Sequence, residues 1–496
     1  MTSRLFNVPT AMKFRFLTSC LLILPFTIPA ASQSADADTS AKKPNVIVIF
    51  TDDHGYADLS CVGTEKDVKT PHLDRMAAEG VRFTDGYITA PQCCPSRAGL
   101  LTGRDQNRFR FSANQMGGLP LSEITLADRL GKAGYVTGMV GKWHLDNTNK
   151  DRQKYHPRAR GFQETFNGHT NRYSATYDLE GNRFNQLRTV NTKGDRLDRQ
   201  SDAAVQFIDH HHKNPFFLYL AYYAPHVPLE SSKKYLDRFP GEMPERRRYA
   251  LAMISAVDDG VGRIMARLKH YGIDDSTLII FLSDNGAPLK LTMEDLSMKI
   301  KGGAWDGSKN TPLNGEKGML AEGGIRVPFL VRWKDTIPAG QVNKTPVSSL
   351  DIAATACAAA GVKHPEEFDG LDLLPMLAKG KPLAERTLYW RFWGQSAARK
   401  GDWKFLKLGN NQSFLFNLAN DISESNNLIK KHPEIADQLE KSAATWARDL
   451  KPAGLPDTNV NIQEIFFYHH FFKTPLPKGI DPKRNPFNKL GKKKGK

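Results

Sequence analysis

The chain has 496 residues, 40% of them hydrophobic and 25% charged, a composition typical of a globular protein rather than a disordered or fibrous one. This length accommodates one large domain and a smaller one around a sizeable core. The formal net charge of +16 is concentrated at the ends, because residues 1–35 contain three basic side chains and residues 473–496 carry a net +8. About +5 remains for the body of the chain, so no specific nucleic-acid partner is predicted.

The basic C-terminal tail, residues 471–496, is rich in Pro, Asn and Lys and is predicted to be disordered. We interpret it as a solvated terminus; the alternative is nonspecific binding to a polyanionic matrix or to nucleic acid.

The N-terminal segment has the layout of a signal peptide. Lys13 and Arg15 precede an apolar run over residues 16–29, and the small residues 30–32 follow it. The run is too short and too interrupted by proline to cross a bilayer, so no membrane span is predicted. We predict a signal peptide over residues 1–32 and export of the mature protein, which would be periplasmic or secreted.

An alternative for the same segment is a lipid anchor, because Leu17-Thr18-Ser19-Cys20 resembles a bacterial lipoprotein box. In such a box the apolar run precedes the cysteine, whereas here it follows. Either Met1 or Met12 is compatible with this layout as the start of translation. The four cysteines left after export have no spacing typical of a disulfide framework or a zinc site, although a bond between two adjacent ones stays open; they are Cys61, Cys93, Cys94 and Cys357.

The first predicted element is a strand over residues 46–50, a continuous apolar run typical of a strand buried on both faces of a parallel sheet. It ends in Thr51-Asp52-Asp53-His54-Gly55. A helix is then predicted from Pro71 to Gly80, and a short strand over residues 82–87.

The next stretch reads Cys93-Cys94-Pro95-Ser96-Arg97, followed by Leu101-Thr102-Gly103-Arg104. Pro95 restricts Cys94 to extended geometry, so Cys93 is expected at the end of an extended segment that leads into a helix. A buried thiol ahead of a core helix is the plain alternative.

Strands and helices then alternate, which predicts an α/β sandwich with a large, mostly parallel central sheet. Residues 145–200 and 287–315 are expected to form irregular surface loops. The predicted strands cover residues 135–140, 216–220, 278–282 and 328–333, and the predicted helices cover residues 123–132 and 249–268.

Beyond Gly380 the pattern changes to short strands and one helix, which predicts a small α+β subdomain with an antiparallel sheet. We therefore assign a catalytic domain to residues 43–380 and the subdomain to residues 381–470. The predicted strands are 387–393, 403–408 and 414–418, and the predicted helix is 433–450.

Acidic and amide side chains follow two of the buried strands. Asp52 and Asp53 come after the first, and Asp284 and Asn285 come after the strand over 278–282. Ligands of open α/β sheets bind outside the carboxyl ends of the strands, and oxygen ligands suit a hard cation such as Ca²⁺ or Mg²⁺. Each pair taken alone is equally compatible with a tight turn, but the two together predict a metal site.

Cationic side chains occupy similar positions and predict a pocket for a compact oxyanion. They are Arg97, Lys142, His144, His226 and Lys317.

The phrases around these residues resemble the signatures of type I sulfatases over about residues 43–450. They point to the arylsulfatase and N-acetylgalactosamine-6-sulfatase branch, and they imply an alkaline-phosphatase-like fold. The phrases are C-x-P-S-R-x-x-x-L-T-G-R from Cys93, and the stretches Pro44–Val46, Thr70–Arg75, Gly141–Leu145, Ser283–Gly286 and Glu322–Pro328.

In that family the motif cysteine is oxidised to formylglycine, whose hydrate is the nucleophile. The resemblance implies that a formylglycine-generating or sulfatase-maturating enzyme converts Cys93 to 3-oxoalanine (formylglycine). It implies one Ca²⁺ per chain, held by Asp52, Asp53, Asp284, Asn285 and the modified Cys93. It further implies that Arg97 and Lys142 hold the hydrate, that His144 assists its second hydroxyl, and that His226 and Lys317 contact the sulfate and the leaving oxygen. Two positions are particular to this chain: Asp146 stands where many members have glycine, and Cys94 fills the variable position.

The sequence thus predicts an exported sulfuric ester hydrolase. Export and aromatic residues in the expected loops, such as Trp305 and Tyr173, favour a sulfated carbohydrate or polysaccharide as substrate. Two alternatives stay open: a phosphatase or phosphonate monoester hydrolase of the same superfamily, and a non-catalytic polyanion-binding protein with an unconverted cysteine.

Overall fold

The computed structural model describes residues 43–114, 117–146, 151–168, 171–289, 305–452 and 461–481, all within one compact unit. The predicted signal peptide, the lipoprotein-like box and residues 482–496 of the basic tail lie outside these ranges. Within them, no helix is both long enough and apolar enough to cross a bilayer. None of the four described cysteines forms a disulfide, so no bond joins Cys93 to Cys94.

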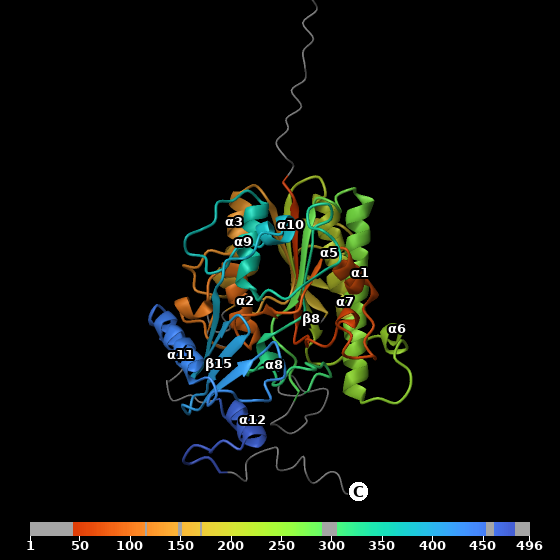
Figure 1. Ribbon diagram of the computed structural model, residues 1–496. Coiled ribbons are helices and arrows are strands. Elements are labelled where there is room, and N and C mark those ends of the chain that lie inside the picture. The colour runs from red at the N-terminus through yellow and green to blue at the C-terminus, as the bar shows by residue number, and fades with distance from the viewer. Residues whose placement is uncertain are drawn as a thin grey trace, which may run out of the picture. The chain divides into compact units, whose positions relative to one another are not determined.

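A ten-stranded mixed sheet forms the centre of the molecule (Figure 1). In spatial order its strands are β11 (Gln341–Asn343), β2 (Val81–Phe83), β10 (Phe329–Arg332), β9 (Thr277–Ser283), β1 (Asn45–Asp52), β8 (Phe216–Pro225), β4 (Val136–Gly141), β5 (Glu164–Gly168), β6 (Arg172–Tyr177) and β7 (Arg183–Asn191). The middle strands β9, β1, β8, β4 and β5 are parallel neighbours, and antiparallel pairs flank them on both sides. The predicted α/β class with a large, mostly parallel sheet is confirmed. The strand predicted over 82–87 is divided between β2 and β3 (Gly86–Tyr87), which pairs separately with β12 (Val347–Ser348).

Helices cover both faces of this sheet (Figure 1). One layer contains α2 (Cys93–Thr102), α3 (Leu126–Lys132) and α9 (Leu350–Ala359), and the other contains α1 (Pro71–Ala78), α5 (Arg196–His211) and α7 (Glu245–His270). Val46, Val48 and Phe50 pack into the first layer, and Ile47 and Ile49 into the second. Because alternate residues of a strand face opposite sides, burial of both faces requires the continuous apolar run of β1.

Shorter helical elements connect these layers. They are α4 (Arg152–Tyr155), α6 (Lys233–Leu236), α8 (Glu322–Ile325) and α10 (Leu374–Lys379), with 3-10 turns at Ser60–Val62, Gln106–Phe109 and Pro157–Arg160.

The prediction of irregular loops over residues 145–200 is wrong. This segment contains β5, β6 and β7 and the start of α5. It was missed because β7 is mostly exposed and polar, so no apolar alternation marks it as a strand. The described parts of 287–315, residues 287–289 and 305–315, contain no helix or strand, as expected.

The prediction of extended geometry at Cys94 is also wrong. Helix α2 begins at Cys93, and the extended residue is its N-cap, Gln92, with φ −141° and ψ 148°. Pro95 therefore lies in the first turn, where its missing N–H would have had no partner within the helix. Cys93 is the first helical residue rather than the end of a strand.

A second, antiparallel sheet forms near the C-terminus (Figure 1). It contains β13 (Thr387–Phe392), β14 (Gln395–Lys400), β15 (Trp403–Lys407) and β16 (Ser413–Asn417), and α11 (Pro433–Arg448) packs on one face. Phe405 and Leu415 face α11, whereas Trp390 and Phe414 belong to the main core. The predicted small antiparallel sheet is thereby confirmed, but β14 and α12 (Ile462–Phe472) were not predicted.

The residues after α12 differ from the predicted tail. Leu476 and Ile480 pack against the main core. Residues 471–481 thus belong to α12 and to a packed segment, and not to a disordered tail.

A buried ion cluster joins the second sheet to the short helix α8. Lys404 of β15 lies 2.8 Å from Glu322 Oε1 and 2.8 Å from Glu424 Oε1, and it donates to the Leu320 carbonyl at 2.8 Å. All three charged side chains are at most 1% exposed. A carboxylate left without its cation in such a place carries a large desolvation cost.

We expect Lys404→Met to lower the free energy of unfolding by about 3 kcal/mol or more, because two buried carboxylates lose their shared cation. The matched control is Lys407→Met in the same strand, whose partner Glu440 is 43% exposed; its effect should stay below about 1 kcal/mol. Denaturant unfolding measures both. Equal losses of unfolding free energy in the two variants would show that the buried cluster stabilises the protein no more than an exposed ion pair does.

Candidate active site

The predicted polar residues lie together at the edge of the main sheet where its parallel strands end. The register pairs Thr51 with Ser283 and Asp52 with Pro225, so β1, β9 and β8 end side by side. The turns that follow these strands, and the turn after β4, therefore meet in one place.

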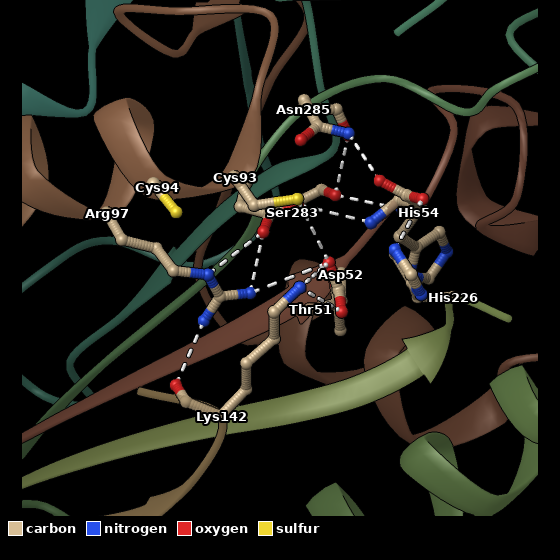
Figure 2. A network of polar contacts seen from close by, with 12 residues as sticks. Thr51, Asp52, His54, Cys93, Cys94, Arg97, Lys142, His226, Ser283 and Asn285 are labelled. Carbon is tan, nitrogen blue, oxygen red and sulfur yellow. Dashed lines mark hydrogen bonds and ion pairs between the residues drawn. The ribbon is translucent and has the colours of Figure 1, made fainter. Parts of the chain in front are cut away.

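The acidic and amide side chains form a tight group around Cys93, in which Figure 2 shows Asp52, Cys93 and Asn285 close together. Asp53 has a left-handed φ of 63° and donates its backbone N–H to Asp284 Oδ1 at 3.1 Å. Asn285 Nδ2 donates to Asp53 Oδ1 at 2.6 Å, and Cys93 Sγ lies 3.6 Å from Asp52 Oδ1. All five side chains are buried.

Arg97 links the cysteine helix to two strand ends (Figure 2). Its Nε and Nη2 donate to Asp284 Oδ2 at 3.0 and 2.6 Å, and its Nη1 donates to the Lys142 carbonyl oxygen at 3.2 Å. The guanidinium carbon lies 5.2 Å from the centroid of the Phe50 ring. Arg97 stands one turn after Cys93, so these contacts fix the start of α2 against β9 and β4.

Two lysines complete the positive charge. Lys142 Nζ lies 2.7 and 2.8 Å from the two oxygens of Asp52, and Lys317 Nζ lies 2.7 and 2.8 Å from the two oxygens of Asp53. Burial opposes their charge, but the carboxylates outweigh it and raise the pKa of both lysines above the usual range. Both side chains therefore stay cationic.

The carboxyl groups respond differently to burial. Burial would raise the pKa of Asp52, but Lys142, His226 and Arg97 outweigh burial and hold that pKa well below its usual range. Burial raises the pKa of Asp284 to about 6, although Arg97 opposes this shift. Asp284 is therefore easier to protonate than Asp52.

Cys93 is a poor nucleophile as a thiol. Burial, followed by the charge of Asp284, raises the pKa of the Cys93 thiol well above its ordinary value. The thiolate is the reactive form of cysteine, and this environment disfavours it.

The two histidines of the site have different contacts. His144 has a φ of 58°, and its buried Nδ1 has no hydrogen-bond partner. Burial, followed by Lys142 and Arg97, lowers the pKa of His144 to about 2, so its imidazole is neutral. His226 Nδ1 lies 2.5 Å from the Val227 carbonyl oxygen, which leaves Nε2 facing Asp53 Oδ2 at 3.6 Å.

A cavity of about 270 Å³ opens onto this group. Asn167 and Tyr223 line it and were missed as site residues, because Asn167 lies in the segment taken for a loop. The only sequence signal for Tyr223 is its position three residues before His226, just after the predicted strand over 216–220. The lining residues are Lys142, Trp143, His144, Asp146, Asn167, Tyr223 and His226.

The residues present fit a bound metal ion. Ligand atoms of Asp52, Asp53, Cys93 and His226 all lie within 4.8 Å of one another. The buried Oδ1 of Asn285 has no hydrogen-bond partner. An orphaned amide oxygen beside clustered carboxylates suits a hard cation such as Ca²⁺. Asp284 Oδ2 contacts Arg97 in this structure, and its Oδ1 faces the Asp53 amide.

Comparisons with known proteins agree with this arrangement. Residues 44–362 match the family model described as Sulfatase, and residues 315–448 match the one described as N-sulphoglucosamine sulphohydrolase, C-terminal. The N-acetylgalactosamine-6-sulfatase of Mus musculus is 36% identical over 380 residues, which cover 70% of this chain and 69% of the relative. Arylsulfatase G of Rattus norvegicus is 31% identical over 508 residues, which cover 89% and 93%.

Solved structures show the same fold. The Ps i-CgsB structure in complex with k-i-k-neocarrahexaose has a TM-score of 0.73 and 32% identity, with 88% of this chain and 98% of that chain covered. The phosphonate monoester hydrolase of Agrobacterium radiobacter, at 22% identity and a TM-score of 0.61 over 82% and 96%, shares the fold alone. The Sulfatase model spans every residue predicted for the site. The chain therefore belongs to the type I sulfatase family and is a sulfuric ester hydrolase.

Proposed function

We propose that this sulfatase is exported and hydrolyses sulfate esters of a carbohydrate, with Cys93 converted to formylglycine by a maturating enzyme and one Ca²⁺ bound beside it. The observation that carries the proposal is the position of Cys93. Its thiol is buried and neutral, yet it stands among carboxylates and in reach of Arg97, Lys142 and Lys317. Such a place suits an attacking oxygen better than a thiol.

Formylglycine at position 93 and Ca²⁺ would supply the nucleophile and its activation. One hydroxyl of the hydrated aldehyde would attack sulfur as the ester's alcohol leaves, and loss of the proton from the other would reform the aldehyde as sulfate leaves. Ca²⁺, held by Asp52, Asp53, Asp284, Asn285 and residue 93, would lower the pKa of the attacking hydroxyl and neutralise sulfate oxygens.

The chain's own residues would hold the charges and move the protons. Arg97 and Lys142 would hold residue 93 and stabilise negative charge that develops on it. His144, whose buried Nδ1 has no hydrogen-bond partner, would take the proton from the second hydroxyl. Lys317 or His226 would protonate the departing alcohol oxygen as its bond to sulfur breaks.

A carbohydrate substrate is supported by the relatives and by the cavity. The relatives' names refer to N-acetylgalactosamine 6-sulfate and to carrageenan oligosaccharide. Asp146 and Asn167 place a carboxylate and an amide in the cavity wall beside Tyr223. Such groups hydrogen-bond and stack on sugar rings.

The first prediction concerns residue 93. In protein matured with a formylglycine-generating enzyme, the peptide that contains residue 93 should have lost its sulfur, as mass spectrometry will show. Cys93→Ala should lower kcat by at least about 10⁴-fold, because it removes the nucleophile. Cys94→Ala, the adjacent thiol, should keep most of the activity. Full activity with an unconverted Cys93 would contradict the proposal.

The second prediction concerns the metal. Calcium at a hundredfold excess over its Kd should stabilise chelator-treated enzyme by about 2.7 kcal/mol and restore its activity. Asp53→Asn should weaken this response. Asp275→Asn, whose carboxylate pairs with the solvent-accessible Lys334, should not. Activity that is unaffected by chelation would count against the metal site.

The third prediction concerns the substrate. A panel of sulfated galactosamine, glucosamine and carrageenan oligosaccharides should include substrates that release inorganic sulfate, measured by ion chromatography. An aryl sulfate should be cleaved faster than the matching aryl phosphate, and the reverse order would favour the phosphatase alternative. Binding of sulfated polysaccharide without release of sulfate by converted enzyme would favour a polyanion-binding protein.

A further inference from the structure

Three metal-ligating side chains converge at the opposite end of the main sheet from the active site. Glu164 is the first residue of β5, and His210 and His211 are the last residues of α5. Glu164 Oε2 lies 3.1 Å from His211 Nε2 and 3.7 Å from His210 Nδ1. One ligand atom from each residue lies within 4.8 Å of the other two.

This cluster is separate from the catalytic residues. β5 runs parallel to β4, and the active site follows the carboxyl ends of these strands. Glu164 stands at the amino end of β5, and His211 precedes the amino end of β8 at Phe216.

The converging atoms are buried and face mainly one another. Glu164 and His211 are 5% and 4% exposed, and the His210 side chain is 11% exposed. Glu164 Oε2 lies at ion-pair distance from both histidines, and no hydrogen bond from any other described residue reaches Glu164 Oε2, His210 Nδ1 or His211 Nε2. A carboxylate oxygen and two imidazole nitrogens that face one another in the interior need a positive charge among them, either a proton on a histidine or a bound cation.

The surrounding contacts orient these atoms as metal ligands. His210 Nε2 lies 3.2 Å from the Gly181 carbonyl oxygen, so Nε2 carries the hydrogen and Nδ1 directs a lone pair at the cluster. Arg183 Nε donates to Glu164 Oε1 at 2.8 Å, which occupies that oxygen and leaves Oε2 for the cluster. Outer hydrogen bonds of this kind typically support metal-binding histidines and carboxylates.

We propose that Glu164, His210 and His211 bind a structural divalent metal ion, for which Zn²⁺ is the best match. Two imidazole nitrogens and one carboxylate oxygen suit zinc, whereas calcium prefers oxygen ligands throughout. The burial of the cluster excludes a substrate, so the ion would act on stability. It would join β5 to the end of α5 and so fasten the antiparallel strands β5, β6 and β7 to the helix layer.

The competing explanation is a metal-free ion pair between Glu164 and a protonated histidine. A metal site would bind a transition metal and an ion pair would not, and Co²⁺ is a spectroscopic probe of such binding. The protein for the test is the full chain in a Cys93→Ser background, loaded with Ca²⁺ and stripped of transition metals, so that the Cys93 thiol offers no ligand.

We expect one equivalent of Co²⁺ to give visible d–d absorption that Zn²⁺ abolishes, and Zn²⁺ to raise the thermal midpoint. Glu164→Gln and His210→Gln should each weaken binding by more than about 100-fold, the upper range for loss of an outer-shell partner. The matched control is His212→Gln, since the His212 ring stacks on Tyr271 at 3.8 Å, away from the cluster. It should bind Co²⁺ like the parent protein.

Circular dichroism will verify that each variant is folded, and Glu164→Gln preserves the shape of the side chain if His210→Gln does not fold. Absence of the d–d bands in the parent protein would overturn the proposal and leave the ion pair. Retention of the bands in a folded Glu164→Gln variant would overturn it as well.

Discussion

Charge balance at the carboxyl edge of the sheet determines where the other elements of this protein lie. Asp52 and Asp284 end neighbouring strands and are fully buried, so each needs a cation in contact. Lys142, in the turn after β4, forms an ion pair with Asp52, and Arg97, in α2, forms one with Asp284. If any of these elements moved, a buried charged side chain would lose the ion pair that compensates its charge. The site is therefore fixed by the same contacts that hold the sheet and its helices together.

Backbone strain accompanies this arrangement at two positions. Asp53 and His144 both have left-handed backbones, which side chains other than glycine adopt at some cost. In the turn after β4, a Cβ at Gly141 would lie 2.0 Å from the Ala221 carbonyl oxygen, so only glycine fits there. The close approach of β4 to β8 and the positive φ of His144 together place Lys142 and His144 at the sheet edge that carries Asp52. The parallel register of the sheet keeps this turn in place.

Much of this was predictable because burial leaves a simple pattern in sequence. Strands such as β1 and β9 are buried on both faces and read as continuous apolar runs, and polar residues directly after them belong at a shared edge. β7 carried no such signal, because nearly all of its residues are exposed. Strand β5, which contains Asn167, lies in the same segment and was missed as well. Glu164 and His210 were also unpredictable, since residues 46 positions apart are brought together only by the packing of α5 on the sheet. Cys94 was misjudged because a proline in the first turn costs the helix no backbone hydrogen bond, so the helix that begins at Cys93 outweighs the preference of the residue before proline for extended geometry.

The C-terminal segment contributes to the active site without touching it. Lys317 lies on an irregular stretch whose position depends on contacts from elsewhere. The Leu320 carbonyl accepts from Lys404 of β15, and the Leu320 N–H donates to Glu464 of α12 at 2.9 Å. Gly318 N donates to the Pro91 carbonyl oxygen at 2.8 Å, just before the cysteine helix. Because Lys317 is held between α2 and the C-terminal elements, a change in β15 or α12 would move a cation relative to Cys93. The second sheet is in this sense part of the catalytic architecture, which its sequence, free of catalytic motifs, gives no reason to expect.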